Sequence, residues 1–301
     1  MDIGHRIKYS VPAFEVNHFS GIDNVSKSVR AEYETDTKHY IFPLEVAVNV
    51  LIDDKRAIES RKGFSLEVSG TDIHSLWADE KNCFFCDGTS LYELTPDFDT
   101  ILIRQGLTRA RMVYVPVNDK VYYSNGFEMG YIRNHQSYTI EDPQISFKSP
   151  LFPGRFMDYH KGRLYIAVQN ILYVSDPLAE YFDIRSGWMI FNSNIRMVKA
   201  VERGIYVADE KTWFINLDDE PVMRKASDET AVEYTDVSVI GAFGFNEKIA
   251  IWTSPRGICV GRNDGVVENI TERKYLLTEK NEGCAFISES NNVKHYINTL
   301  I

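Results

Sequence analysis

The chain has 301 residues, with 33 Lys and Arg against 43 Asp and Glu, and its formal charge at pH 7 is −10. Hydrophobic residues make up 44% of it and charged residues 25%, which excludes a disordered or collagen-like chain and predicts a packed core. The acidic balance argues against a nucleic-acid clamp, because gripping phosphates requires clustered Lys and Arg.

The first ten residues lack the basic end and the apolar stretch of a signal peptide, so we expect no export by that route. The longest apolar runs, such as Val46 to Ile52, are too short for a membrane span, and we expect none. Four cysteines in a chain of this length do not suggest a disulfide framework, which predicts a reducing compartment during assembly.

Residues 1–44 carry two apolar patches, Tyr9 to Val16 and His39 to Leu44. A polar stretch from Ser26 to Lys38 separates them. This composition is typical of an arm or tether. We therefore divide the chain into an N-terminal arm, 1–44, and a single domain, 45–301.

Within the domain one unit recurs: an apolar strand, a polar turn, a second strand rich in Tyr, Ile, Val or Phe, another turn and a third strand. Its second strands begin near Cys83, Val121, Leu164, Ile205, Ile249 and Lys294. The turns before these strands carry hairpin residues, namely Glu80 to Asn82, Asn118 to Lys120, His160 to Arg163, Glu202 to Gly204, Asn246 to Lys248 and Asn291-Asn292. Further hairpin signals are Asp87-Gly88, Asn125-Gly126 and Asp264-Gly265.

A period near 40 to 45 residues with about four short strands per unit predicts an all-β fold, the β-propeller, whose blades are small sheets packed against one another. The last unit stops after two strands, and an open blade would expose strand edges. Two or three N-terminal strands are placed to close the ring by pairing with the C-terminal hairpin, at Val46 to Ile52, Arg56 to Ser60 and Phe64 to Val68. We predict six blades, or seven if residues 45–69 and the hairpin form separate blades.

Cys83 and Cys86 have the spacing of half a zinc site. In a strand, however, residues three apart point to opposite faces, so the two thiols would not converge. No second pair exists, because Cys259 and Cys284 lie far apart in the sequence. We interpret Cys83 and Cys86 as strand residues of the core.

The seven histidines are isolated in the sequence and show no metalloprotease pairing. They are His5, His18, His39, His74, His135, His160 and His295. His160 falls in a predicted hairpin turn and His74 at a strand start, where solvated or hydrogen-bonding histidine is common. No Gly-x-Ser-x-Gly elbow and no phosphate-binding glycine loop occurs. The sequence therefore predicts no catalytic residue, no cofactor and no metal site.

Acidic clusters are further candidates for calcium binding or for general acid and base catalysis. They are Asp53-Asp54, Asp218-Asp219-Glu220 and Asp228-Glu229. Their positions fit loops and lack the regular spacing of a calcium loop, so we interpret them as solvated turns. A propeller glycosidase, with carboxylates around the central axis, stays open as the enzyme alternative.

The aromatic residues, 17 Phe, 17 Tyr and 4 Trp, could form a sugar-stacking surface. Most of them fall in predicted strands, where packing between blades accounts for them. Examples are Tyr122, Tyr123, Tyr165, Tyr173, Tyr206, Trp213 and Trp252. Asn24-Val25-Ser26 and Asn269-Ile270-Thr271 match glycosylation acceptors, which carry little weight without an export signal.

Ten stretches of the chain, read in order, carry a resemblance to a known family. They are Gly21 to Ser26, Glu45 to Asp54, Arg61 to Phe64, His74 to Trp77, Gly88 to Tyr92, Val121 to Gly126, Gly162 to Tyr165, Tyr173 to Leu178, Trp252 to Gly261 and Asn269 to Glu272. Over about residues 20 to 300 the chain resembles β-propeller structural proteins of tailed phages and prophages. Where longer members carry an inserted domain, between Ile132 and Arg155, this chain has only about two dozen residues.

The resemblance implies a structural virion protein, a tail nozzle or hub that forms a conduit ring for DNA ejection. It also implies a homo-oligomeric ring, other tail proteins (adaptor, portal or tail fibre) as partners, and assembly in the host cytoplasm. DNA would pass only as non-specific cargo, and a charge of −10 is compatible with a lumen that repels it. The alternatives are a carbohydrate-binding or receptor-adhesion propeller and a propeller glycosidase or lyase.

Overall fold

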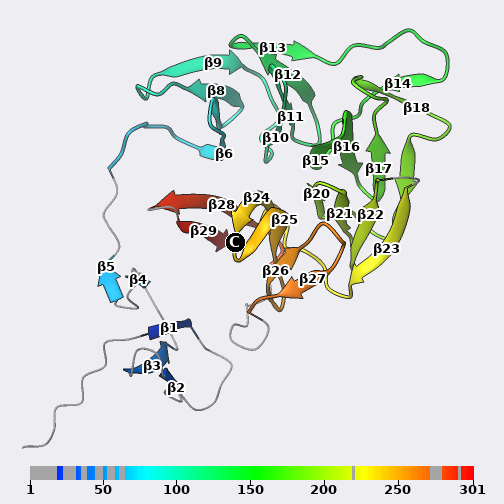
Figure 1. Ribbon diagram of the computed structural model, residues 1–301. Helices are drawn as coiled ribbons and strands as arrows, with labels where there is room; N and C mark the ends of the chain where they lie inside the picture. The colour runs from blue at the N-terminus through cyan, green and yellow to red at the C-terminus, as the bar shows by residue number, and fades with distance from the viewer. Residues whose placement is uncertain are drawn as a thin grey trace, which may run out of the picture. The chain divides into compact units, whose positions relative to one another are not determined.

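The computed structural model describes residues 19–22, 32–34, 39–44, 50–52, 58–60, 65–218, 221–271, 280–290 and 293–301. The chain divides into two compact units, 1–65 with 273–276 and 66–272 with 277–301, and each is described by itself. Every regular element in the described residues is a β-strand, which confirms the predicted all-β class (Figure 1). That part of the chain has no helix long and apolar enough to cross a membrane.

Among its described residues the smaller unit contains two short sheets. In the first, β1 (Phe19–Ile22) pairs in parallel with β3 (His39–Leu44), and β3 pairs antiparallel with β2 (Glu32–Glu34). In the second, β4 (Val50–Ile52) pairs antiparallel with β5 (Ile58–Ser60). Both strands of the second sheet fall in segments that the sequence assigns to strands.

The third predicted N-terminal strand, Phe64 to Val68, is wrong in its described part. Phe64 lies outside the described residues, and residues 65–68 form no strand. Leu66 is 83% exposed, so the apolar residues of this alternating segment have no core to pack against.

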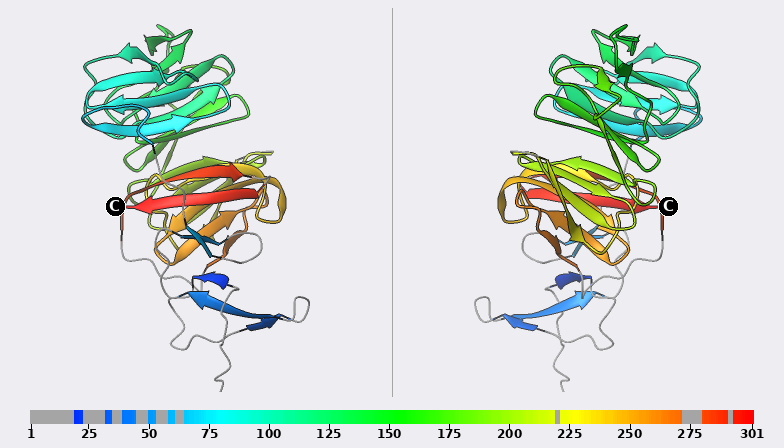
Figure 2. Two further views of the ribbon diagram at one scale, coloured as in Figure 1. Left: turned by 90° about the vertical axis from the view of Figure 1, so that its left-hand side faces the viewer. Right: turned by 90° about the vertical axis from the view of Figure 1, so that its right-hand side faces the viewer.

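The larger unit contains five four-stranded antiparallel sheets among its described residues (Figures 1 and 2). The first is β6 (Ile73–Ala78), β7 (Cys83–Asp87), β8 (Ser90–Leu94) and β9 (Thr100–Arg104). The second is β10 (Val113–Val117), β11 (Lys120–Ser124), β12 (Met129–Arg133) and β13 (Gln136–Thr139). The third is β15 (Phe156–His160), β16 (Arg163–Val168), β17 (Ile171–Val174) and β19 (Trp188–Ile190).

The fourth sheet is β20 (Met197–Ala200), β21 (Gly204–Ala208), β22 (Thr212–Asn216) and β23 (Val222–Ser227). The fifth is β24 (Val237–Ala242), β25 (Phe245–Ser254), β26 (Gly257–Gly261) and β27 (Val267–Asn269). Beside the third sheet, β14 (Lys148–Pro150) pairs with β18 (Tyr181–Asp183). The chain ends in the hairpin of β28 (Gly283–Ser290) and β29 (Val293–Leu300).

The second strands β7, β11, β16, β21, β25 and β29 include every residue at which the sequence predicts one, which confirms the repeat. One predicted turn is wrong. Asn246 to Lys248 lies inside β25, and the turn stands earlier at Phe243-Gly244. Phe243 and Gly244 both have positive φ, 53° and 82°. Gly favours this conformation, but an aromatic residue does not, so the sequence gives no turn signal at Phe243.

Hydrophobic clusters fill the space between each sheet and the next. Phe84 of the first sheet packs with Tyr123 of the second, and Ile166 of the third lies in a cluster with Val115 of the second. Further clusters join the third sheet to the fourth and the fourth to the fifth, where Trp252 is 1% exposed. In the second to fifth sheets, apolar residues at alternate strand positions thus serve two neighbouring interfaces, because these sheets are covered on both faces.

The C-terminal hairpin covers the fifth sheet with one face only. Ile287 and Tyr296 pack on a cluster that includes Ile249. On the other face Phe286 and Ile297 stand directly opposite each other and are 53% and 41% exposed. In the described strand pairings β28 and β29 form one two-stranded sheet and β4 and β5 another, so the closure of the ring and the blade count of six stay predictions.

Candidate functional site

The first strand of each sheet has two chemically distinct ends. A connector from the preceding sheet enters at one end, which we call the connector end. The hairpin turn to the second strand leaves at the other, which we call the hairpin end. Because the strands are antiparallel, the turns between third and fourth strands also lie at the hairpin end. Polar clusters occupy both ends.

At the connector end, Arg155 joins the start of the third sheet to the connector before the fifth sheet and to the C-terminal hairpin. Its Nη2 lies 2.6 Å from Glu233 Oε2 and 3.6 Å from Glu282 Oε1. Its Nε donates to the Tyr234 hydroxyl at 3.3 Å. Arg111 stacks 4.5 Å from the centre of the Tyr234 ring and donates to the Gly283 carbonyl. The charged groups here pair with one another across the connectors and so hold them together. We call this cluster the connector clamp; it consists of Arg111, Arg155, Glu233, Tyr234 and Glu282.

Glu233 and Glu282 are the two carboxylates of this clamp. Burial raises the pKa of Glu233 above its usual value, and the attraction of Arg155 opposes that rise. A carboxyl group whose pKa is raised is what a general acid requires. Both carboxylates, however, share the guanidinium of Arg155.

Beyond the clamp, a buried ion triad joins the first strands of the third and fourth sheets to the connector before the fifth. Lys199 Nζ lies 2.9 Å from Asp236 Oδ2 and 3.6 Å from Asp158 Oδ2, and its side chain is 17% exposed. The backbone N–H of Ala200 also donates to Asp158 at 2.9 Å. Burial alone would lower the pKa of Lys199, but Asp236 and Asp158 outweigh it and hold the pKa above the usual value.

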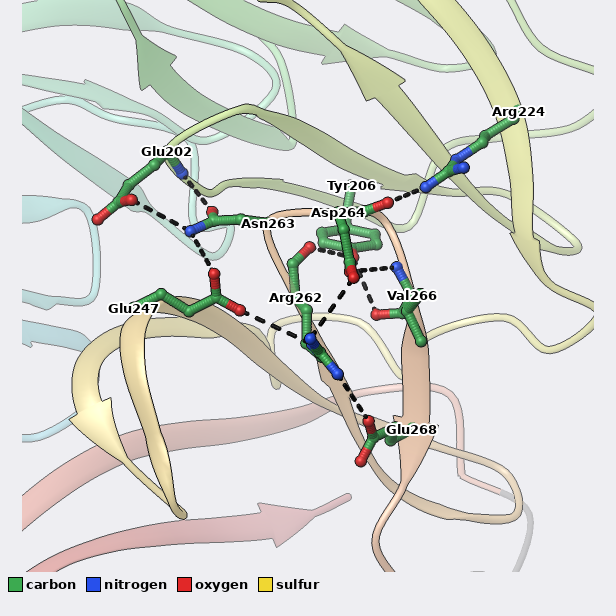
Figure 3. Close-up of polar contacts among 9 residues, drawn as sticks. All are labelled: Glu202, Tyr206, Arg224, Glu247, Arg262, Asn263, Asp264, Val266 and Glu268. Carbon is green, nitrogen blue, oxygen red and sulfur yellow. Dashed lines mark hydrogen bonds and ion pairs between the residues drawn. The ribbon is translucent and has the colours of Figure 1, made fainter.

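At the hairpin end, Asn263 bridges the fourth and fifth sheets (Figure 3). Its Nδ2 donates to Glu202 Oε2 at 3.1 Å and to Glu247 Oε2 at 2.9 Å. Its Oδ1 accepts the backbone N–H of Glu202 at 2.8 Å. The side chain is 5% exposed, so all of its hydrogen-bonding groups are buried and satisfied.

Arg262, next to Asn263, lies among three carboxylates (Figure 3). The closest distances to its guanidinium are 3.4 Å for Glu268, 3.5 Å for Asp264 and 3.7 Å for Glu247. The Tyr206 hydroxyl donates to the Arg262 carbonyl at 2.6 Å, and burial raises the pKa of Tyr206. The network clamps the fourth sheet to the fifth.

No protein-family model matches the chain, and no curated protein matches it. Solved structures do match. The crystal structure of BBS1N in complex with ARL6DN aligns with a TM-score of 0.54 and 8% identity, over 95% of this chain and 91% of that one. The fold is a β-propeller.

Two other solved structures are less similar. The WD40 domain of Neurospora crassa Pan2 has a TM-score of 0.45 and 11% identity, over 63% of this chain. This chain spans 61% of that domain, less than two thirds. The N-terminal domain of Nup159 has a TM-score of 0.46 and 10% identity, over 74% of this chain and 67% of that one. At such identities the likeness concerns the fold alone.

Within the propeller, the cysteines lie as strand alternation predicts. Cys86 is buried in the cluster with Phe84, and Cys83 is half-buried. Burial raises the pKa of both thiols, which keeps them protonated at neutral pH. In the described part of the chain no three His, Cys, Asp or Glu side chains are grouped to hold a metal ion.

The predicted acidic clusters are paired where the structure describes them. Asp218 lies 2.5 Å from Arg203 and 3.1 Å from Lys161, and hydrogen bonds from these two cations lower its pKa. Asp228 pairs with Lys225 at 2.7 Å, which likewise lowers its pKa. Asp53, Asp54, Asp219 and Glu220 lie outside the described residues, and Glu229 accepts a hydrogen bond from Ser254 at 2.8 Å.

The histidines occupy separate places. His74 Nε2 lies 3.0 Å from the Gly88 carbonyl, and His135 Nδ1 lies 2.8 Å from Glu93 Oε2. His160 ends β15, before its turn, and is 6% exposed. His39 and His295 stand in β3 and β29, and His5 and His18 lie outside the described residues.

The aromatic residues named from the sequence are core residues. Tyr122, Tyr123, Tyr165, Tyr206 and Trp252 are buried. Tyr173 and Trp213 are half-buried and pack against neighbouring clusters. Of the two glycosylation motifs, Asn24 to Ser26 lies outside the described residues, and Asn269 accepts the backbone N–H of Thr271 at 3.0 Å.

Sequence reasoning missed the connector clamp. Glu233 and Glu282 belong to none of the acidic clusters and lie 49 residues apart. A signal was present, because Arg111, Arg155 and Arg196 each stand just before the first strand of successive sheets. An alignment of the repeats on their strand starts would have placed these arginines at one end of the propeller.

Proposed function

We propose that this chain is a structural component of a bacteriophage virion, a tail nozzle or hub that assembles into a conduit ring for DNA ejection. The observation that carries the assembly role is a set of exposed apolar side chains at the rim of the third sheet. The resemblance along the sequence supplies the phage context.

These side chains, the rim patch, are Phe147, Ile184, Trp188 and Ile190, which are 56%, 49%, 41% and 59% exposed. The backbone N–H of Ile184 donates to the Phe147 carbonyl at 3.0 Å, and Trp188 Nε1 donates to the Ile184 carbonyl at 3.0 Å. Phe147, Ile184 and Trp188 therefore lie close together, and Ile190 follows Trp188 on the same face of β19. Contiguous exposed apolar side chains with an aromatic anchor are typical of protein–protein contacts.

In the proposed ring, copies contact one another and other tail proteins, namely an adaptor, a portal or a tail fibre. Assembly takes place in the host cytoplasm, and the product is part of the virion tail. DNA is passing cargo, since a chain of charge −10 offers phosphates no net attraction. The pairing of Arg111 and Arg155 within the connector clamp supports this, because these cations already have partners.

We also propose six blades, with the N-terminal strands completing the sixth. Five four-stranded sheets and the β28–β29 hairpin account for five blades and half of another. The exposed pair of Phe286 and Ile297 gives the half blade an apolar face still to be covered. Two further strands from residues 45–60, paired with the edge of the hairpin, would complete the blade that presents this face.

Hydrogen exchange tests this closure. A chain that begins at residue 61 should exchange the backbone amides of Val293–Leu300 at least about tenfold faster than the full chain, because β29 loses a paired neighbour. Amides of β21, in the fourth sheet, are the internal control. Equal exchange of β29 in the two chains would contradict closure by residues 45–60.

Cryo-electron microscopy of the assembled particle tests the virion role. The expected result is a ring of copies below the portal, with propellers around a channel of DNA width and the rim patch at a contact. Absence of the chain from the particle, or isolated copies at the tail periphery, would overturn the conduit proposal.

One observation favours a second candidate, a glycosidase or a carbohydrate-binding propeller. Glu233 and Glu282 converge at the connector end, and the pKa of Glu233 is raised. A glycan screen with the intact chain tests binding and turnover. Turnover that Glu233→Gln abolishes would favour the enzyme, and binding without turnover would favour adhesion.

A further inference from the structure

The outermost strand of the third sheet has an open edge. Among the described strands β19 pairs with β17 alone. Across this pairing the Gly187 carbonyl accepts a hydrogen bond at 2.9 Å, and the Phe191 N–H donates one at 2.8 Å. Because hydrogen-bonded pairs alternate along an antiparallel ladder, the backbone N–H and C=O groups of Trp188 and Ile190 point away from β17. An added strand would find donors and acceptors there.

Side chains on both faces of β19 are apolar. Trp188 and Ile190 lie on the face of the rim patch and are 41% and 59% exposed. Met189 lies on the opposite face and packs against the cluster between the third and fourth sheets. A strand added at this edge would therefore continue an apolar surface on each of its two faces.

The rim patch is held in place before any partner binds. The Arg185 guanidinium lies 4.6 Å from the centre of the Phe147 ring and pairs with Asp183 at 2.6 Å. The indole N–H of Trp188 donates to the Ile184 carbonyl at 3.0 Å. These contacts fix the two exposed rings, so little conformational entropy is lost when they are covered.

The N-terminal segment Tyr9 to Val16 has the pattern that suits this edge. It precedes residue 19, where the described part of the chain begins. In an extended strand its apolar residues fall on both faces: Tyr9, Val11 and Ala13 on one, and Pro12, Phe14 and Val16 on the other. Pro12 has no N–H to donate, which restricts such a strand to the outside of a sheet. The segment therefore fits an edge and prevents further strands from adding.

A second copy of the chain is the source of this segment in the proposed ring. If residues 45–60 complete the sixth blade, the third sheet lies three blades away, on the opposite side of a six-blade propeller. The sheet of β1, β2 and β3 takes up residues between the segment and that blade, which leaves little extended chain to span the propeller. In a ring, by contrast, every copy has a neighbour on each side.

We propose that residues 9–16 of one copy add to β19 of the next copy as an outermost strand and cover its rim patch. The inference rests on the proposed ring of copies. Each copy provides one segment and receives one, so the contact is heterologous and a ring of identical contacts closes. The backbone of Trp188 and Ile190 provides the hydrogen bonds, and the rim patch takes the apolar side chains of the segment.

Cross-linking between two isotopic forms of the full chain tests this contact. Phe14→benzoylphenylalanine is made in light chains, which are mixed with heavy-isotope chains, concentrated and irradiated. We expect mass spectrometry to find position 14 of a light chain joined to the tryptic peptide 186–196 of a heavy chain, which contains β19. Links to that peptide within single chains only, or no link to it, would overturn the proposal.

Charged substitutions measure how far assembly depends on the contact. Phe14→Asp and Ile190→Asp should each raise the concentration of half-assembly about tenfold or more, because each places a charge against apolar side chains. Light scattering measures this concentration. Since both remove the same contact, the double variant should assemble no worse than the single ones, and additive losses would contradict the pairing.

Ser28→Asp and Ile240→Asp are the matched controls. Ser28→Asp adds the same charge to the arm outside the segment, and Ile240, in β24, is 58% exposed. Both should assemble as the unchanged chain does, and equal losses in the controls and the test variants would overturn the arm contact. Thermal unfolding verifies that each variant is folded. A ring that keeps its mass in all variants refutes the arm contact alone, because the place of the copies in the particle decides the conduit proposal.

Discussion

Lys199 is the residue on which the interior ion triad of the propeller depends. Its ammonium stands between Asp158 and Asp236, and these carboxylates hold the pKa of the lysine above its usual value. A lysine whose pKa is higher in the folded than in the unfolded protein stabilises the folded state. This contribution is complete below the pKa of the unfolded chain, about 10.4, and is lost as the pH rises through the pKa of the folded protein. The triad is therefore intact at neutral pH.

Lys199→Met should lower the free energy of unfolding by about 3 kcal/mol, because it leaves two carboxylates facing each other without a cation. Urea denaturation measures this. Lys225→Met is the control, since Lys225 pairs with an exposed Asp228 and should change the stability little. Similar losses in the two variants would contradict a special role for the triad.

Phe243 holds a turn conformation that an aromatic residue adopts at a cost. Its φ is 53°, and its side chain is 41% exposed, so little burial offsets the strain. Phe243→Asn should raise the free energy of unfolding by about 0.5 kcal/mol or more, as thermal unfolding would show. The reciprocal change at the β10–β11 turn, Asn118→Phe at φ 57°, should destabilise. A destabilising Phe243→Asn would show that Phe243 has contacts that outweigh the strain.

The C-terminal hairpin is attached to the fifth sheet through Tyr296 of β29. The Tyr296 hydroxyl donates to the Thr235 carbonyl at 2.7 Å and lies 2.9 Å from Thr253 Oγ1. Burial raises the pKa of Tyr296 to about 12. The neutral phenol is thus the form that the folded hairpin requires.

Tyr296→Phe should lower the stability at neutral pH by about 1 kcal/mol, because the Thr235 carbonyl loses its donor. Since the folded pKa is raised, the stabilisation is present below about pH 10 and is lost as the pH rises toward 12. A pH titration followed by tyrosinate absorbance should show, in Tyr296→Phe, one group fewer that titrates near pH 12. Tyr138→Phe, at a 39% exposed site, should change the stability little, and an equal loss there would contradict the docking role.

At the scale of strands, sequence periodicity was sufficient for the repeat but not for every turn. Tyr and Val runs marked β11, β16 and β21 because both faces of each sheet are covered. The Phe243-Gly244 turn was missed because its first residue is not a turn former.

The functional clusters were harder to predict than the strands. Arg155 meets Glu233 only through the packing of different sheets, which no local pattern encodes. His160 was placed near a turn, but its burial depends on the neighbouring sheets. Local spacing predicts which residues form strands, whereas contacts between sheets depend on the whole fold.

For the whole molecule, we predict that deletion of residues 1–44 leaves a folded propeller and abolishes assembly. The reason is that ring contacts between copies are heterologous and can use an arm outside the blades. Light scattering measures the oligomer mass, and thermal unfolding shows whether the propeller remains. An unchanged oligomer after the deletion would contradict the prediction.

The contact between Arg111 and Gly283 spans 172 residues, whereas strands within each sheet are joined by short turns. On the ribosome, early sheets can therefore form while later ones are still being synthesised, since their partners are already present. The contacts of the connector clamp with Glu282 and Gly283 must wait until these residues have been synthesised. A protein truncated before Gly283 would therefore keep its local sheets and lack the contact between Arg111 and the hairpin.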